Sequence, residues 1–398
     1  MKYVVFVPDG CADEPIAELG DRTPLDAARM PNLARLAARS EVGRAVVIPD
    51  GMPAGSDVGN MAILGFDPAR FHTGRAPIEA AAMGVELGPT EVAYRCNLVT
   101  VDDEQDPPVM LDFAAGHPQN RQSHAIIAAL DAELGGGREG VHFHPGVEYR
   151  HLCIVPKSWA DAECAPPHDL TDQPARLPTG PSARHLRDLM DRSKQIVGRV
   201  ARDVGADATQ IWLWGQGVKP ALPSFVETYG VAGRLTSAVD LVTGLGALCG
   251  IEVVDVPGAT AGFDNDYGGQ ARACIESLRD RDFFLLHVEA TDEAGHAGRP
   301  DLKVEALERW DSEIIGPVVG ALDAAGEQYR ILLLPDHATP CALRTHTAAP
   351  VPFLLFDSQR LGPGGRYTES GVAGADSQPA HRLMARLIAD REDPSSTG

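Results

Sequence analysis

The sequence lacks any long apolar segment, and this absence argues against a membrane-spanning helix. A span needs about eighteen consecutive apolar residues, and no run of this 398-residue chain approaches that length. The apolar stretch from Tyr3 to Val7 is followed directly by Pro8 and Asp9, which favours a buried first strand over a signal sequence. We therefore expect a cytoplasmic protein with no membrane partner.

Basic residues and paired cysteine motifs are also scarce. The chain has 35 Lys and Arg against 56 Asp and Glu, a formal net charge of −21, which argues against the basic face of a nucleic-acid binder. It does not exclude a small anionic substrate in a locally positive pocket.

The seven cysteines are scattered, with no C-x-x-C, which predicts reduced thiols. A GxxxxGK[ST] loop is absent, which disfavours a P-loop kinase.

The sequence does contain a series of short apolar runs that end in polar residues. They are YVVFV, IWLW, DFFLLHVEA and RILLLP. Runs that are apolar on both faces are typical of parallel strands buried between helices. Helices are expected between them, over residues 23–38, 60–64, 267–278 and 303–324. The predicted fold class is α/β, with a largely parallel sheet core covered by helices.

The pattern changes between about residues 88 and 205. AYRCNLVTVDD and YRHLCIV alternate like strands, AIIAALDAELG resembles a helix, and a proline-rich stretch follows. We interpret this segment as an inserted α+β domain. The predicted organisation is a core of residues 1–87 and 206–398 with an insertion over 88–205. The last residues, 391–398, are expected to form a frayed tail.

Several histidines and carboxylates follow the predicted strands. Asp292 and His296 are four positions apart, so one helical turn places both on the same face. Since ligands bind at the carboxyl ends of the strands in such sheets, we expect these residues to converge there. The full set is Asp9, Asp292, His296, Asp336, His337 and His346. Such ligands suit Zn²⁺ or Mn²⁺, and six are too many for one tetrahedral ion, which indicates two metals. Each residue alone could equally cap a helix or face solvent.

Ser56 is the candidate nucleophile. Glycine and proline precede it in GMPAGSDVGNMAILGFDP, and a helix-like stretch follows. At a helix N-terminus, backbone N–H groups favour a bound phosphate. A metal can activate the hydroxyl, so no Ser-His-Asp triad is required. The alternative is that Ser56 only caps the helix.

Together these segments resemble the archaeal-type cofactor-independent phosphoglycerate mutases of the alkaline phosphatase superfamily. The likeness covers nearly the whole chain and includes FVPDG, PAGSDVGNMAILGFDP, TGRAPIEAAAMGVEL, PGVEYRHL, PPHDLT, HVEATDEAGH, LPDHATP and RTHTAAPVPF. The resemblance implies an alkaline-phosphatase-like core whose inserted domain binds substrate. It also implies a glycolytic isomerase that needs no bisphosphoglycerate, holds two divalent ions and commonly works as a monomer. Mn²⁺ is the expected metal, although Zn²⁺, Co²⁺ or Mg²⁺ could occupy such ligands.

The resemblance also assigns roles to individual residues. Asp292, His296 and His346 would hold one ion, and Asp9, Ser56, Asp336 and His337 would hold the other. Ser56 would become a transient phosphoserine while the glycerate reorients. The candidates for substrate binding are Arg75, Arg95, His117, Arg150, His168 and Asp169. Arginine grips phosphate or carboxylate with two parallel hydrogen bonds, although each arginine could instead form a structural salt bridge.

The chain departs from the family pattern near the expected substrate pocket. A family lysine is replaced by Thr243, a serine by Ala114, and T-G-Y-x-D-T-N-Y by a sequence containing Asn265 and Asp266. These departures fit either drift in a mutase of 2- and 3-phosphoglycerate or a divergent paralogue. Such a paralogue would apply the same mechanism to a phosphonate-type analogue in phosphonate or phosphinate biosynthesis. A phosphatase, another phosphotransferase and a non-catalytic binding protein are further alternatives.

Overall fold

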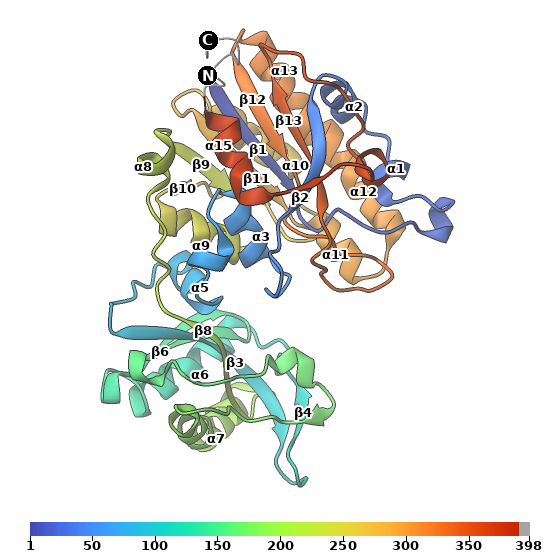
Figure 1. The fold of residues 1–398 in the computed structure, drawn as a ribbon. Helices are drawn as coiled ribbons and strands as arrows, with labels where there is room; N and C mark the ends of the chain where they lie inside the picture. The colour runs from blue at the N-terminus through green and yellow to red at the C-terminus, as the bar shows by residue number, and fades with distance from the viewer. Residues whose placement is uncertain (390–398) are drawn as a thin grey trace. The chain divides into compact units, whose positions relative to one another are not determined.

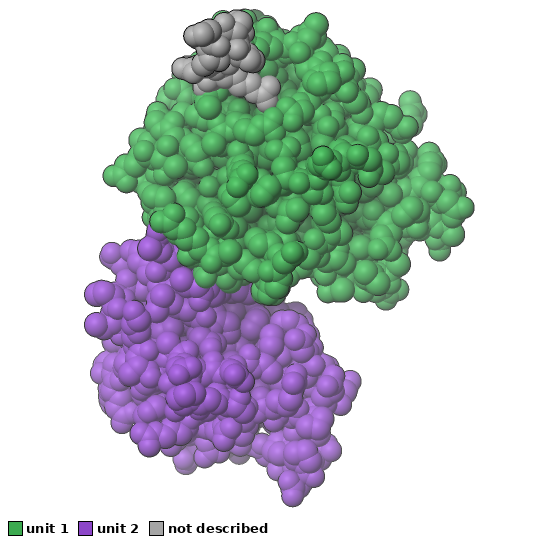
Figure 2. All heavy atoms as spheres, viewed as in Figure 1, with its two compact units in different colours: residues 1–72, 222–398 green, residues 73–221 purple. Residues whose placement is uncertain are grey.

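The computed structural model describes residues 1–389, and the chain forms two compact units (Figure 1, Figure 2). Unit 1 contains residues 1–72 and the chain from Leu222 onward, and unit 2 contains Thr73–Ala221. The predicted tail, 391–398, lies outside the described residues. Within residues 1–389, none of the helices combines the length and apolar character that a bilayer crossing requires.

Unit 1 is built on an eight-stranded sheet in the order β10-β9-β11-β1-β12-β13-β2-β14. The strands are β1 (Lys2–Pro8), β2 (Glu41–Val46), β9 (Gly233–Thr236), β10 (Glu252–Val253), β11 (Phe283–Val288), β12 (Tyr329–Leu333), β13 (Val351–Asp357) and β14 (Ser377–Pro379). All neighbours pair in parallel except β13, which is antiparallel to both β12 and β2. The predicted α/β class with a largely parallel core sheet is confirmed.

Helices cover this sheet. They are α1 (Pro24–Ala27), α2 (Pro31–Ala37), α3 (Ser56–Ile63), α4 (Pro68–Phe71), α8 (Phe225–Tyr229), α9 (Asp240–Cys249), α10 (Tyr267–Ser277), α11 (Ala290–His296), α12 (Pro300–Trp310), α13 (Gly316–Ala324), α14 (Glu369–Val372) and α15 (Leu383–Ile388). A π-helical turn, Asp311–Ile315, joins α12 to α13. The single helix predicted over residues 23–38 is wrong: Thr23 caps α1, but Pro31 starts a separate helix because proline disfavours a helical residue before it.

The central strands bury side chains on both faces. In β11, Phe284 and Leu286 pack into a core shared with α2, α10, α12 and α13. Because side chains alternate along a strand, Leu285 and His287 point to the opposite face. Strands β1, β11 and β12 are buried on both faces, so nearly all of their residues are apolar. This is why these strands could be recognised in the sequence as short apolar runs.

Unit 2 is an α+β unit. Its strands are β3 (Glu91–Asp102), β4 (Val109–Asp112), β5 (His142–Val147), β6 (Arg150–Pro156), β7 (Gln173–Pro174) and β8 (Gln210–Gly217), and its helices are α5 (Ala76–Ala82), α6 (Asn120–Glu133) and α7 (Ala183–Val204). The sheet order is β5-β6-β3-β4-β7, with β8 paired to β3. Side chains of α6 and α7 form one core with β3, β6 and β8.

The structure differs from the predicted organisation around this unit. The IWLW run was expected in the parallel core sheet, but β8 pairs antiparallel with β3 in unit 2. A strand buried under helices has the same apolar pattern in either sheet, so composition could not assign it. Unit 2 also extends beyond the predicted 88–205, since Ala76 and Ala80 of α5 pack against Ala93 of β3.

Candidate active site

The seven residues predicted as metal ligands and nucleophile lie together in unit 1. Asp9 directly follows β1, and Asp336 and His337 lie beyond β12. Asp292 and His296 belong to α11, which follows β11. Parallel neighbours β11, β1 and β12 therefore deliver these side chains to one edge of the sheet.

The first group contains Asp292, His296 and His346. One turn of α11 brings Nε2 of His296 to 3.2 Å from Oδ2 of Asp292. Nε2 of His346 lies 3.4 Å from Oδ1 of the same carboxylate and 2.9 Å from Nε2 of His296. The three residues assigned together by sequence are thus mutual neighbours.

The second group surrounds His337. Its Nε2 lies 3.4 Å from Oδ1 of Asp9, 3.6 Å from Oδ2 of Asp336 and 3.3 Å from Oγ of Ser56. Asp9, Asp336 and His337 are fully buried, and Ser56 is 7 % exposed. The four residues of the second predicted ion therefore also converge.

Ser56 is the first residue of α3, as the sequence predicted. The helix approaches Asp336 so closely that a Cβ at Gly59 would overlap the Asp336 backbone. This close approach lets the Asn60 amide donate to Oδ2 of Asp336 at 2.7 Å and to the carbonyl of Ser56 at 3.0 Å. Asn60 therefore fixes the nucleophile candidate relative to a ligand candidate.

Thr339 joins the two groups. Its hydroxyl donates a short hydrogen bond to Oδ1 of Asp292 and lies 3.1 Å from Nδ1 of His337. Because the Thr339 hydroxyl donates its hydrogen to Asp292, its oxygen accepts a hydrogen bond from Nδ1–H of His337. This tautomer leaves the lone pair of His337 on Nε2, which faces Ser56 and Asp9.

The buried carboxylates oppose one another electrostatically. Burial raises the pKa of Asp9, and the charges of Asp336 and Asp292 raise it further. Burial opposes ionisation of Asp336 as well, but the charges of the neighbouring His337 and His287 hold its pKa below the ordinary value. Hydrogen bonding to Asp292 raises the pKa of His296 to about 9. In residues 1–389, the ion-pair partners of Asp9 and Asp336 are all histidines.

These features fit divalent cations. Ligand atoms about 2.1 Å from a tetrahedral ion lie about 3.4 Å from one another. The distances from Nε2 of His337 to Asp9 and from Nε2 of His346 to Asp292 are both 3.4 Å. Within residues 1–389, both carboxylate oxygens of Asp9 lack a hydrogen-bond partner, a costly arrangement for a buried charge unless a cation accompanies it. The donors are imidazole and carboxylate, which suit Mn²⁺ and Zn²⁺.

Sequence reasoning missed three residues of this cluster: His287, Asn60 and Thr339. His287 is fully buried in β11, with Nε2 3.2 Å from Oδ2 of Asp9. A histidine within an otherwise apolar strand was the available signal. Asn60 and Thr339 gave no such signal, because their roles depend on contacts between distant segments.

The predicted substrate-binding residues gather in unit 2. Arg95 bonds Glu79 at 3.0 Å and lies 4.2 Å above the Trp214 ring. Burial lowers the pKa of Arg95; Glu79 opposes this, while Arg75 and Arg150 lower it further. The charges of Arg75 and Arg150 therefore act on Arg95. A cluster of three positive charges favours the binding of an anion.

Aromatic rings line this basic cluster. His168 lies 5.3 Å from Trp214, and Tyr149 lies 5.3 Å from His117 and 5.7 Å from the Arg150 guanidinium. Asp169 is exposed, 3.7 Å from His168. Trp214 and Tyr149 were not predicted from the sequence, although Tyr149 lies within the resembling segment PGVEYRHL.

The residues that depart from the family pattern can be located in the structure. Asp266 caps α10 by accepting from the Gly269 amide at 2.8 Å. Asn265 is buried and donates to Gln270, whose amide in turn donates to the carbonyl of His287. Thr243 donates to the carbonyl of Asp240 within α9, so it supplies no cation there. Ala114 is buried, and nothing in the structure explains its substitution.

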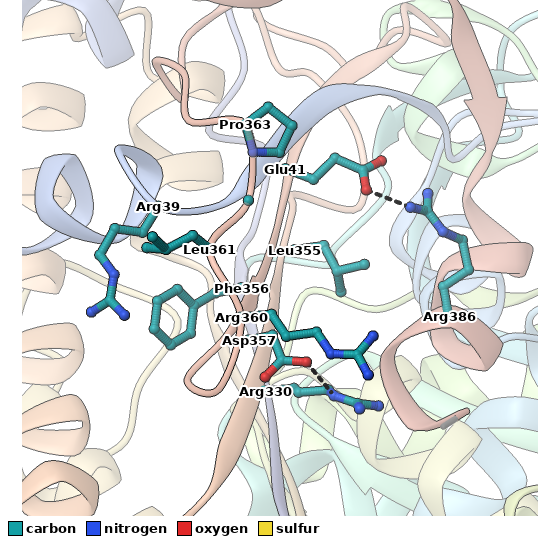
Figure 3. A pocket seen from close by; sticks show the side chains of 11 residues that line it. Arg39, Glu41, Arg330, Leu355, Phe356, Asp357, Arg360, Leu361, Pro363 and Arg386 are labelled. Atoms are coloured by element: carbon teal, nitrogen blue, oxygen red, sulfur yellow. Dashed lines mark hydrogen bonds and ion pairs between the residues drawn. The ribbon is translucent and has the colours of Figure 1, made fainter. Parts of the chain in front are cut away.

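A separate pocket of about 120 Å³ in unit 1 is rich in arginine (Figure 3). Its lining includes Arg39, Glu41, Arg330, Asp357, Arg360 and Arg386. Figure 3 shows Arg386 paired with Glu41 and Arg330 paired with Asp357. Arg330 also donates to the carbonyls of Leu387 and Ala389. These pairs join α15 to β2, β12 and β13, so they have a structural role.

Comparisons with known proteins agree on one family. A family model described as 2,3-bisphosphoglycerate-independent phosphoglycerate mutase matches residues 37–200. A protein of that name from Methanothrix thermoacetophila is 46 % identical over 90 % of this chain and 91 % of its own. Another, from Methanosarcina acetivorans, is 43 % identical over 92 % and 93 %.

Solved structures support the fold. The structure of a Pyrococcus horikoshii protein superposes with a TM-score of 0.78 at 25 % identity, covering 98 % of this chain and 99 % of that one. A cofactor-independent phosphoglycerate mutase from Thermoplasma acidophilum gives a TM-score of 0.65 at 24 % identity with the same coverage. The latter likeness concerns the fold alone.

Proposed function

The chain belongs to the archaeal-type 2,3-bisphosphoglycerate-independent phosphoglycerate mutase family, and on this basis we propose that it interconverts 2- and 3-phosphoglycerate in the cytoplasm. The reaction is an isomerisation by intramolecular phosphoryl transfer, with Ser56 as the transient acceptor. The observation that carries this proposal is the position of Ser56, at the start of α3 and 3.3 Å from His337 within a cluster of buried ligand-type side chains.

Two groups of side chains would hold divalent cations, with Mn²⁺ the expected metal. Asp292, His296 and His346 form one group, and Asp9, Ser56, Asp336 and His337 form the other. Bound cations would neutralise phosphate charge and favour the ionised form of the serine hydroxyl.

Ser56 accepts the phosphoryl group in a first step and returns it in a second. Its Oγ forms a bond to phosphorus while the ester bond to one glycerate hydroxyl breaks, and the serine proton ends on the departing oxygen. After the glycerate reorients, the oxygen of its other hydroxyl bonds to phosphorus while the bond from phosphorus to Oγ of Ser56 breaks, and the hydroxyl proton ends on Oγ of Ser56. Asn60 holds the Ser56 backbone during both steps through its 3.0 Å hydrogen bond.

The basic cluster of unit 2 would recognise the substrate. Arg75, Arg95 and Arg150 would bind the carboxylate and phosphate of the substrate. The rings of His117 and His168 and the carboxylate of Asp169 would contact its hydroxyl groups. The aromatic packing of Arg95 on Trp214 supports a preorganised guanidinium.

Phosphorus NMR tests this function. The metal-loaded enzyme, incubated with 3-phosphoglycerate and no bisphosphoglycerate, should produce the 2-isomer, and the reverse reaction should reach the same ratio. Inorganic phosphate should not accumulate. Failure to isomerise would contradict the proposal, and steady phosphate release would favour a phosphatase.

One observation favours a second candidate, a mutase of a phosphonate-type phosphoglycerate analogue. The hydroxyl of Thr243, which by the resemblance replaces a family lysine, donates to the Asp240 carbonyl within its own helix. Loss of a cation would weaken binding of a phosphate ester. A substrate panel should decide: preferred turnover of the phosphonate analogue over phosphoglycerate would establish this alternative.

A further inference from the structure

We propose that His287 is an additional ligand of the cation held by Asp9 and Asp336. None of the sequence motifs considered above assigns it a role. The inference rests on the proposed metal dependence, because it concerns the same buried cluster. It adds an imidazole from β11 to the ligands expected from the loops and helices around Ser56.

Three unpartnered atoms converge at this position. Nε2 of His287 lies 3.2 Å from Oδ2 of Asp9 and 3.9 Å from Oδ2 of Asp336, and all three residues are fully buried. Within residues 1–389, neither Nε2 of His287 nor either oxygen of Asp9 has a hydrogen-bond partner. One ligand atom from each residue lies within 4.8 Å of the others, as expected for side chains around one ion.

A simple hydrogen bond does not explain the contact. The ring nitrogen and the Asp9 carboxylate are close, but the pair lacks hydrogen-bond geometry. A buried histidine that only filled space would not face two carboxylates. His337 approaches Oδ1 of Asp9, whereas His287 approaches Oδ2, so the two imidazoles use different oxygens of one carboxylate.

The surroundings of His287 set its orientation. Nδ1 lies 3.1 Å from Oγ of Ser237, and that oxygen also accepts the Val239 amide at 3.0 Å. A hydroxyl oxygen can accept two hydrogen bonds, so Oγ of Ser237 can also accept one from Nδ1–H of His287, and this tautomer leaves the Nε2 lone pair free. On the backbone side, Gln270 donates to the His287 carbonyl at 3.0 Å. The ring is therefore fixed from both ends.

The first test uses Co²⁺ as a spectroscopic probe of the variant His287→Cys. If position 287 coordinates the ion, the metal-free variant should gain a sulfur-to-cobalt charge-transfer band on addition of Co²⁺. The matched control Ser237→Cys places a thiol one residue layer farther away and should give no such band. A variant that binds Co²⁺ with the stoichiometry of the original enzyme but shows no band would overturn the proposal.

The second test needs no substitution and so does not depend on how variants fold. The unaltered enzyme, labelled with ¹⁵N-histidine and loaded with ¹¹³Cd²⁺, should show four imidazole nitrogens coupled to cadmium, from His287, His296, His337 and His346. Coupling to only three, with His287 uncoupled, would overturn the proposal. Both tests measure coordination, so an enzyme without mutase turnover that still showed His287 coupled would refute the function and leave this inference standing.

Discussion

The hydroxyl oxygen of Ser56 lies 3.3 Å from Nε2 of His337, although 281 positions separate the two residues. The contact joins the start of α3 to the segment beyond β12. It places the candidate nucleophile directly beside a candidate metal ligand.

Ser56→Ala should abolish isomerisation while leaving most of the bound metal. The substitution removes the phosphoryl acceptor but only one of the five side chains proposed to hold that cation. Turnover is measured by phosphorus NMR and metal content by elemental analysis. Ser40→Ala is the matched control, because Ser40 is a buried serine whose hydroxyl donates to the Leu36 carbonyl, away from the candidate site. An unchanged rate in Ser56→Ala would show that another group accepts the phosphoryl group.

Thr339→Val should weaken metal binding, since it removes the hydroxyl that contacts both Asp292 and His337. Loss of a group that orients metal ligands typically costs 10- to 100-fold in affinity or activity, so we expect about that loss of Mn²⁺ affinity by calorimetry. Thr339→Ser keeps the hydroxyl and should restore most of the affinity. Equal losses in both variants would indicate a packing role instead.

The sequence was informative where a single segment carries the signal. Asp292 and His296 lie one turn apart on α11, and Asp9 and Asp336 follow buried strands, so helical spacing and strand ends sufficed to select them. Their meeting at one sheet edge follows from parallel pairing.

The remainder depended on contacts that no local pattern encodes. Thr339 matters because of two side chains from other positions. The pairing of β8 with β3 could not be read from an apolar run, because either sheet would bury it. Trp214 became visible as a platform for Arg95 only when these strands were seen to be neighbours.

Lys303→Met should strongly destabilise unit 1. Lys303 and Asp13 are a fully buried ion pair at 2.9 Å, and the ammonium also donates to the Thr339 carbonyl at 2.8 Å. Removing one partner of a buried pair typically costs about 3–5 kcal/mol, because the other charge is left uncompensated. Chemical denaturation measures this loss. The double variant with Asp13→Asn should recover part of it, whereas a further loss would contradict the ion-pair account.

Acid should destabilise unit 2 through His151. Its ring is buried, Nδ1 accepts the Gly146 amide at 2.9 Å, and burial lowers its pKa to about 3. Unfolded histidine titrates near pH 6.5, so between pH 6.5 and 3 the unfolded state binds the extra proton and stability falls as pH falls. From pH 7 to 5, this residue should cost about 2 kcal/mol.

Tryptophan fluorescence during urea unfolding can measure this effect, since three of the four tryptophans, Trp159, Trp212 and Trp214, belong to unit 2. His151→Asn keeps an acceptor for the Gly146 amide but cannot take up the proton, so it should lose less stability between pH 7 and 5 than the unaltered chain. His124→Gln, an exposed position in the same unit, is the control and should keep most of the pH dependence. If His151→Asn lost as much stability on acidification as the unaltered chain, protonation of His151 would not be the cause.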